Sequence, residues 1–310
     1  MNLLLIGDLH GRKPRVHFKN FDAIIQVGDV ASDKELAPWT KKWFKYIKEN
    51  PEESISLDKF LVSKLGRKRL KKMEKRSLNV GRKILEYLNS FNKPVFIVPG
   101  NWDESYGESK IKNPDKDTYS YLKAFYDWWL GDKINPKLIK GLKNIKDCQY
   151  KLRKFKGINF IGYGLVSAPE DLSIRKKGFK INGKINKKQW KILEKSYSKI
   201  IVKLDGVFKE ADKKLPIIFI SHNIPYKTKL DIITDKKSYA YKKHLGSFIA
   251  RRFCIKYKPI LCIGGHIHDH KGKDKIGKTI VINPGFGSNA QVLVEVDNEK
   301  GKIKNIKFLK

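Results

Sequence analysis

The chain of 310 residues has few cysteines and few acidic residues, with 3 cysteines and 32 acidic side chains against 67 lysines and arginines. Cys148, Cys254 and Cys262 show no CxxC spacing, and their odd number argues against a disulfide framework. We therefore expect a protein of a reducing compartment, the cytoplasm.

The sequence also lacks the marks of secreted and membrane proteins. No apolar run approaches the roughly 18 residues that a membrane helix needs. The chain opens directly on the apolar residues 3–6, without a basic segment or a cleavage site before them. No internal repeat or low-complexity linker divides it. We expect no membrane partner and a single domain over residues 1–310.

The excess of basic residues gives a net charge of +35 and a pI near 9.9, which is typical of proteins that bind nucleic acid. Two features favour a compositional origin instead. Lysine supplies most of the charge along the whole chain, and arginine, the better bidentate ligand for phosphate, is scarcer. The densest basic run, residues 66–72, is interpreted as a solvated helix face rather than a nucleic-acid stripe. Nucleic acid stays an alternative partner.

Five short apolar runs are each followed at once by side chains that commonly bind metals. The runs, each given with the metal-binding residue types that come after it, are 3–6 with Asp8 and His10, 24–27 with Asp29, 95–98 with Asn101 and Asp103, 217–220 with His222, and 260–263 with His266 and His268. Such runs predict strands covered on both faces. Sites in layered α/β folds form just past the strand ends. We therefore expect the ligands to converge.

Helices are predicted between these strands, from apolar residues at helical spacing across 57–65 and 80–91. An aromatic-rich segment within 104–147 predicts another helix, either a cap over the site or a packed core element. Further helices are expected at 187–214 and between 223 and 258. A hairpin is expected at Lys156-Gly157, with late strands at 279–283, 291–296 and 303–308.

The motifs D-x-H, G-D, G-N-x-D, a strand-terminal His and G-H-x-H, in this order over residues 8–268, resemble the signature of the calcineurin-like metallophosphoesterase superfamily. Segments 221–226, 244–247 and 283–285 resemble archaeal and bacterial predicted phosphoesterases related to cyclic-nucleotide phosphodiesterases. The resemblance implies an α/β fold, a four-layer sandwich of two mixed β-sheets packed together and flanked by helices. Residues 31–80 and 104–147 carry no family motif and are expected to be helical insertions.

The resemblance also implies two divalent metal ions. It places Asp8, His10, Asp29 and His268 around one ion, and Asp29, Asn101, His222 and His266 around the other, with Asp29 bridging them. Carboxylate, imidazole and amide ligands suit manganese, our first choice, or iron, zinc, nickel or cobalt, and argue against a thiolate site.

The implied activity is that of a dinuclear metal-dependent hydrolase acting on a small phosphoester. A hydroxide held by both ions would attack a phosphodiester or an activated phosphomonoester, with Asn101 and His266 also facing the phosphate. Two alternatives stay open. One is a nuclease acting on single-stranded nucleic acid, and the other is a metal-bound scaffold with little catalysis.

One residue departs from the family pattern. Many members have a histidine after Gly-Asn, a proton donor to the leaving group, whereas this chain has Trp102, whose indole cannot supply a proton. We therefore expect weak activity on alkyl monoesters.

Three further residues near the motifs have a structural and a functional interpretation. Asp103 is expected to hydrogen-bond a ligand imidazole, with a surface capping role as the alternative. His244 and Ser247 either contact the phosphate or serve the fold, Ser247 as a helix N-cap.

Overall fold

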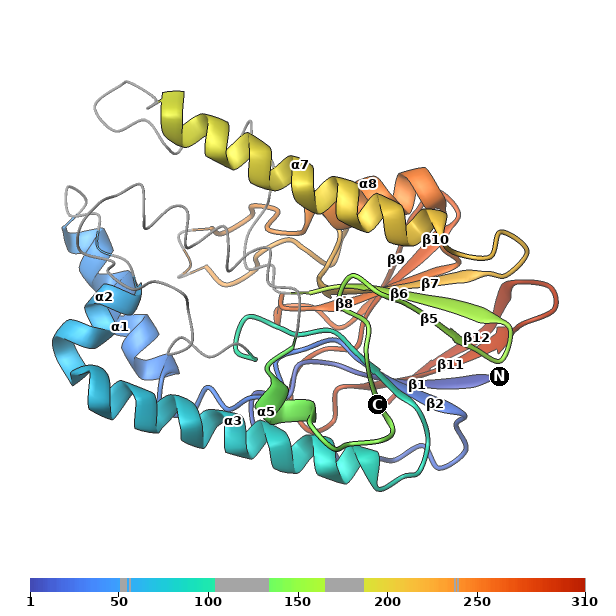
Figure 1. The fold of residues 1–310 in the computed structure, drawn as a ribbon, viewed down its shortest axis with the longest axis horizontal. Helices are drawn as coiled ribbons and strands as arrows, with labels where there is room; N and C mark the ends of the chain where they lie inside the picture. The colour runs from blue at the N-terminus through green and yellow to red at the C-terminus, as the bar shows by residue number, and fades with distance from the viewer. Residues whose placement is uncertain are drawn as a thin grey trace.

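The computed structural model describes residues 1–50, 55, 57–103, 134–164, 187–236, 238 and 240–309. Two mixed sheets of six strands each pack face to face, and helices cover both outer faces (Figure 1). The predicted four-layer α/β sandwich is confirmed.

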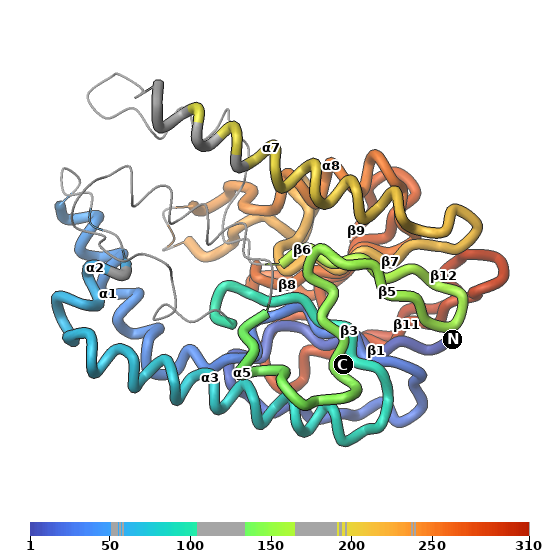
Figure 2. Tube along the Cα trace, in the orientation of Figure 1, coloured from blue at the N-terminus to red at the C-terminus, as the bar shows by residue number. Residues whose placement is uncertain are grey.

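The first sheet contains the N-terminal strands and the two last strands of the chain. Its order is β12 (Lys302–Phe308), β11 (Gln291–Asp297), β1 (Asn2–Ile6), β2 (Ala23–Gln26), β3 (Val95–Ile97) and β4 (Ile145–Asp147). Strands β1 to β4 are parallel, while β11 is antiparallel to both β1 and β12. Figure 2 shows this return of the red C-terminal trace to the blue N-terminal strand.

The second sheet follows the same plan, with parallel strands in the middle. Its order is β5 (Leu152–Phe155), β6 (Ile158–Tyr163), β7 (Ile217–Asn223), β8 (Leu261–Gly265), β10 (Thr279–Asn283) and β9 (Gly272–Ile276). Strands β6, β7, β8 and β10 are parallel, and the two edge strands are antiparallel to their neighbours.

The core consists of three apolar layers. Between the sheets, Phe96 of β3 stacks on Phe160 of β6 with ring centroids 4.1 Å apart. On the outer face of the first sheet, Leu85 and Leu88 of α3 (Arg67–Asn89) pack beside the short α5 (Pro136–Ile139). On the outer face of the second sheet, the helices α7 (Lys187–Lys209), which contains Phe208, and α8 (Phe248–Tyr257) cover β7.

Residues 31–80, predicted to be a helical insertion, are largely helical where the structure describes them. This stretch holds α1 (Ala37–Glu49), α2 (Leu57–Leu65) and most of α3. Helix α3 continues to Asn89, so this element belongs partly to the sheet's own covering layer. Within residues 66–72 only Leu70 is buried, as expected for a solvated basic face.

The end of the segment 104–147, predicted to be a helical insertion, contains a strand of the first sheet. Residues 145–147 form β4, an edge strand whose three residues are too few to show a pattern, and residues 136–139 form α5. The aromatic segment expected to be helical lies outside the described residues. Among those that are described, no helix combines the length and apolar character needed to cross a membrane.

Candidate metal centre

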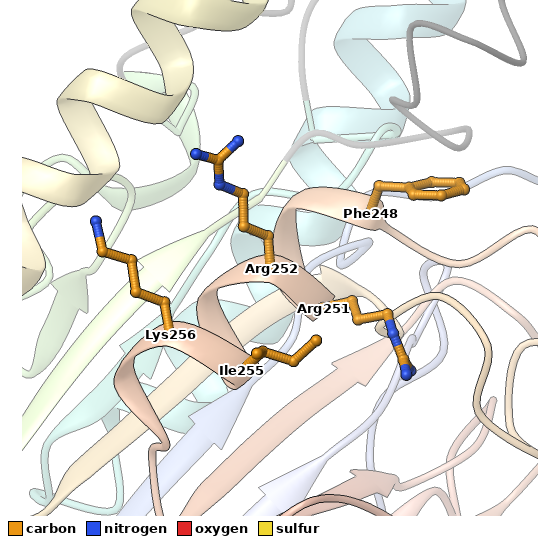
Figure 3. Close-up of a pocket in the computed structure, with 5 residues that line it drawn as sticks. All are labelled: Phe248, Arg251, Arg252, Ile255 and Lys256. Carbon is orange, nitrogen blue, oxygen red and sulfur yellow. The ribbon is translucent and has the colours of Figure 1, made fainter.

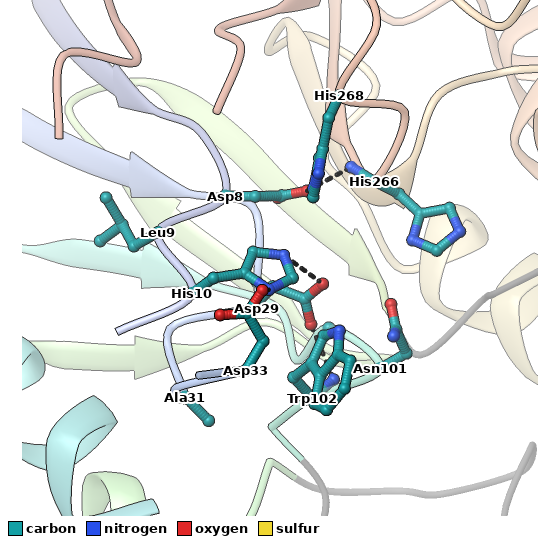
Figure 4. A network of polar contacts seen from close by, with 12 residues as sticks. Asp8, Leu9, His10, Asp29, Ala31, Asp33, Asn101, Trp102, His266 and His268 are labelled. Carbon is teal, nitrogen blue, oxygen red and sulfur yellow. Dashed lines mark hydrogen bonds and ion pairs between the residues drawn. The ribbon is translucent and has the colours of Figure 1, made fainter. Parts of the chain in front are cut away.

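All seven predicted metal ligands lie together at one edge of the sandwich. Six of them are in the loops that follow β1, β2, β3 and β8 and are labelled in Figure 4, and His222 is at the carboxyl end of β7 itself. These strands are parallel within their sheets, so their carboxyl ends share an edge. The sequence-based expectation of convergence is confirmed for the described residues.

One group of ligands consists of Asp8, His10 and His268, whose ligand atoms all lie within 4.8 Å of one another. His268 Nε2 lies 3.2 Å from Asp8 Oδ2. The backbone N–H of His266 donates to the same oxygen at 2.5 Å. Asp8 and His10 are buried, whereas the side chain of His268 is 36% exposed.

The other group consists of Asp29, His222 and His266, again within 4.8 Å of one another, and Asn101 joins it. Asn101 Oδ1 lies 3.0 Å from His222 Nε2. The same end of this amide is 3.0 Å from His266 Nδ1 and 3.2 Å from Asp29 Oδ2. Four potential ligand atoms therefore surround one point.

Asp29 lies between the two groups. Its Oδ2 is 3.3 Å from His10 Nε2 in one group and 3.4 Å from His222 Nε2 in the other. Its Oδ1 accepts the backbone N–H of Trp102 at 2.7 Å. A single carboxylate oxygen thus faces both groups.

Backbone conformation directs three of these side chains. His10, Asp29 and His266 have φ of 44°, 55° and 62°, the left-handed region that non-glycine residues rarely adopt. Each such residue costs of order 1–3 kcal/mol, a strain typical of functional sites. Two glycines make room for the carboxylates: a Cβ at Gly100 would lie 2.2 Å from Asp29 Oδ1, and one at Gly265 would lie 2.3 Å from Asp8 Oδ1.

The hydrogen bonding fits a cation. His222 Nδ1 lies 2.9 Å from the carbonyl oxygen of Val27, which can only accept, so Nδ1 carries the proton. The Nε2 lone pair then faces Asn101 Oδ1 and Asp29 Oδ2, and acceptors meet without a proton between them. Asp8 Oδ1, fully buried, has no hydrogen-bond partner in the described part of the chain. Such a set is satisfied by divalent cations.

The Asn101 amide can also satisfy the site without a metal. Turned over, its Nδ2 would donate to His222, His266 and Asp29, and its Oδ1 would accept from Trp102 Nε1 at 3.2 Å. The amide orientation is therefore expected to depend on whether a cation is bound.

The protonation states of the metal-free site follow from burial and from the carboxylates. Burial opposes the charge on His10, but Asp29, Asp33 and Asp8 outweigh it and raise the His10 pKa to about 10. Burial and the neighbouring His222 lower the His266 pKa to about 4. Burial disfavours the charged Asp29, but His222 and His10 bring its pKa well below the usual range. Asp29 and His266 are thus in ligand form, while His10 must release a proton to bind a metal.

Comparison with known protein families gives a match over most of this chain. Residues 1–270 match the family model described as calcineurin-like phosphoesterase. The chain belongs to this family. Members of this family are phosphoesterases that use divalent metals, and each of the two groups above could hold a metal ion.

The individual relatives add little about function. An uncharacterized protein of Methanocaldococcus jannaschii is 31% identical over 137 residues, which is 43% of this chain and 51% of the relative. The chain thus spans about half the length of the curated relative it matches. One crystal structure aligns over 100% of this chain and 99% of its own at a TM-score of 0.54 and 18% identity, which shows the shared fold. The crystal structure of TT1561 from Thermus thermophilus aligns over 99% of this chain and 98% of its own, with a TM-score of 0.44 and 13% identity.

Asp103 differs from our expectation. Its fully buried carboxylate does not contact an imidazole but accepts four backbone N–H groups. Oδ2 accepts from Asp29 at 2.7 Å and from Gly100 at 2.9 Å, and Oδ1 accepts from Val30 and Ala31 at 2.9 Å each. It ties the loop after β2 to the loop after β3. The surface capping interpretation is wrong as well.

Asp33 was not predicted from the sequence. Its Oδ2 lies 3.2 Å from His10 Nδ1, the carboxylate–histidine arrangement that orients a metal ligand. The available signal was its position four residues after Asp29 in the same loop, but no motif distinguishes it there.

Ser247 and His244 do not join either ligand group. Ser247 caps α8, because its buried hydroxyl accepts the Ala250 N–H at 2.9 Å, in agreement with the structural interpretation. His244 Nδ1 lies 2.7 Å from Asp231, a fully buried carboxylate that also accepts the Thr228 N–H at 2.8 Å. This carboxylate fixes the His244 ring.

Trp102 forms part of the wall of the site. Its indole meets the His10 ring edge to face at 6.0 Å and packs against the apolar clusters around α3. Trp102 therefore supports two predicted ligands, His10 through its ring and Asp29 through its backbone N–H.

A shallow depression of about 400 Å³ on α8 contains none of the predicted ligands (Figure 3). Its cations are partly engaged: Arg251 donates to the Tyr226 carbonyl at 2.9 Å, and Lys256 pairs with Asp205. It gives no support for a second active site.

Proposed function

We propose that this protein hydrolyses phosphodiesters or activated phosphomonoesters with two divalent cations, manganese as the first candidate and iron, zinc, nickel or cobalt as the others. The observation that carries the proposal is the position of Asp29, whose Oδ2 is 3.3 Å and 3.4 Å from imidazole nitrogens of two different ligand groups. A shared carboxylate is what two neighbouring cations need to offset their repulsion.

In this proposal each group holds one cation and Asp29 bridges them. The full ligand sets are Asp8, His10, Asp29 and His268 for one, and Asp29, Asn101, His222 and His266 for the other. When bound, such a pair lowers the pKa of water and offsets the charge of a phosphoryl group.

Side chains of the protein would position the phosphate. His222 is fully buried, whereas Asn101 and His266 are partly exposed, so these two are the members of their group that an approaching phosphate can reach. In this proposal a phosphoester would be held by the bound cations and by the side chains of Asn101 and His266.

Trp102 defines the substrate class. Its indole cannot protonate a departing alkoxide, so esters whose leaving group is already stable are favoured. Aryl esters and diesters with acidic leaving groups meet this condition, and alkyl monoesters do not.

The test is a screen of manganese-loaded protein against p-nitrophenyl phosphate, bis-p-nitrophenyl phosphate, cyclic nucleotides and single-stranded DNA. The Asp29→Asn variant is the blank, because it keeps the shape of the side chain and removes the shared charge. We expect turnover of one or both aryl esters by the wild type only. Equal rates in both proteins would refute the proposal, and a preference for DNA would favour the nuclease alternative.

A further inference from the structure

His268 differs from His10 and His222 in how its ring is held. His10 has Asp33 at its second nitrogen, at 3.2 Å, and His222 has the Val27 carbonyl at 2.9 Å. In the described part of the chain, His268 Nδ1 has no comparable acceptor. His268 is also the most exposed of the three, at 36% against 4% for His10 and 0% for His222.

An aromatic stack takes the place of the missing hydrogen bond. The Phe286 ring lies almost parallel to the His268 ring, with centroids 4.2 Å apart and an interplanar angle of 24°. The same ring meets His10 edge to face at 5.3 Å. The guanidinium of Arg12 lies 4.5 Å from the Phe286 centroid. Phe286 thus contacts two predicted ligands of the same group and the guanidinium of Arg12.

The stack is anchored to the loop that carries Asp8 and His10. Phe286 forms an isolated bridge with Asp8, and the next N–H, of Gly287, donates to the Asp8 carbonyl at 2.8 Å. Arg12 donates to the His10 carbonyl at 3.2 Å. The ring is therefore fixed by its backbone even though 38% of it is exposed.

We infer that Phe286, with Arg12 against its ring, is the positioning residue for His268, and that it sets the affinity of the more exposed metal site. This inference rests on the proposed dinuclear function. Ring stacking restrains an imidazole less tightly than a hydrogen bond to a carboxylate or carbonyl. The cation held by Asp8, His10 and His268 is consequently the weaker of the two, and catalysis appears only when that site fills.

The experiment is a calorimetric titration of EDTA-treated protein with Co²⁺, followed in parallel by the visible absorption of the bound ion. The wild type should take up two ions in two phases. Phe286→Leu, which keeps apolar bulk but removes the ring, should weaken the second phase by roughly tenfold to a hundredfold, the usual effect of losing a ligand's support. Phe286→Tyr keeps the aromatic ring, so its second phase should have the affinity of the wild type.

The matched control is Phe248→Leu. Phe248 is also partly exposed and stacked, at 3.7 Å and 22° on Tyr226, which is not a predicted ligand, so both phases should stay as in the wild type. Two unchanged phases in Phe286→Leu would overturn the inference while leaving the proposed function in place. Uptake of fewer than two ions by the wild type would overturn both.

Discussion

Replacing Asp103 with asparagine should destabilise the protein and loosen the metal site together. The carboxylate accepts two backbone N–H groups on each oxygen, and asparagine would put an NH₂ where two of these donors point. A hydrogen bond to a charged group contributes about 1.5–3 kcal/mol, so losing two costs roughly 3–6 kcal/mol. This is a large share of the typical 5–15 kcal/mol of total stability.

The assay is urea unfolding of EDTA-treated wild type and variant, at a pH above the Asp103 pKa, which burial and the charge of Asp29 raise to about 6. Metal affinity is then measured by calorimetry. Because Asp103 Oδ2 holds the N–H of Asp29 at 2.7 Å, the variant should also bind metal more weakly.

The control is Asp231→Asn. Asp231 is equally buried and accepts backbone N–H groups of Lys227, Thr228 and Gly246, none of them in a ligand loop. It should lose comparable stability but keep its metal affinity. A loss below about 1 kcal/mol in Asp103→Asn, or equal metal affinity in the two variants, would refute the reasoning.

Three further predictions concern single residues of the site. Folding raises the His10 pKa from 6.5 to about 10, so the stabilisation that the protonated His10 contributes is complete below pH 6.5 and is lost between pH 6.5 and about 10. The free energy of unfolding of the metal-free protein, measured across this pH range, checks this prediction. His10→Gln should flatten the dependence of that free energy on pH. Trp102→His should raise kcat on alkyl monoesters by roughly 10²-fold or more while leaving aryl diesters within a fewfold, the usual effect of a general acid; equal gains on both would contradict the assigned role. Ser247→Ala should lower the free energy of unfolding by about 1 kcal/mol, as a lost N-cap does, with unchanged kcat/KM; a fall in kcat/KM at full stability would instead place Ser247 at the substrate.

The sequence was sufficient for the sheet strands that carry ligands. Each joins an apolar run to a motif, and parallel pairing brings their ends to one edge, so Asp8, Asn101 and His268 could be expected to meet. The hairpin at Lys156-Gly157 was also predictable, and both residues have positive φ, 44° and 72°. The short β4 and the lysine-rich β9 show no comparable run, and neither was predicted.

Contacts between loops were beyond the sequence. Asp103 was expected at an imidazole, but its partners depend on how closely the loop after β2 approaches the loop after β3. Asp33 and Phe286 belong to no motif, and their place beside His10 and His268 follows from loop paths that periodicity does not encode. The same is true of the pairing of His244 with Asp231.

The central claim is that Asp29 lies between two cations, and the most direct test is anomalous diffraction from crystals soaked in manganese. We predict two anomalous peaks, one against Asp8, His10 and His268 and one against Asn101, His222 and His266, both touching Asp29. The Asp29→Asn crystal should lose at least one of them. A wild-type map with no peak at Asp29, or with a single peak confined to one ligand group, would contradict the account.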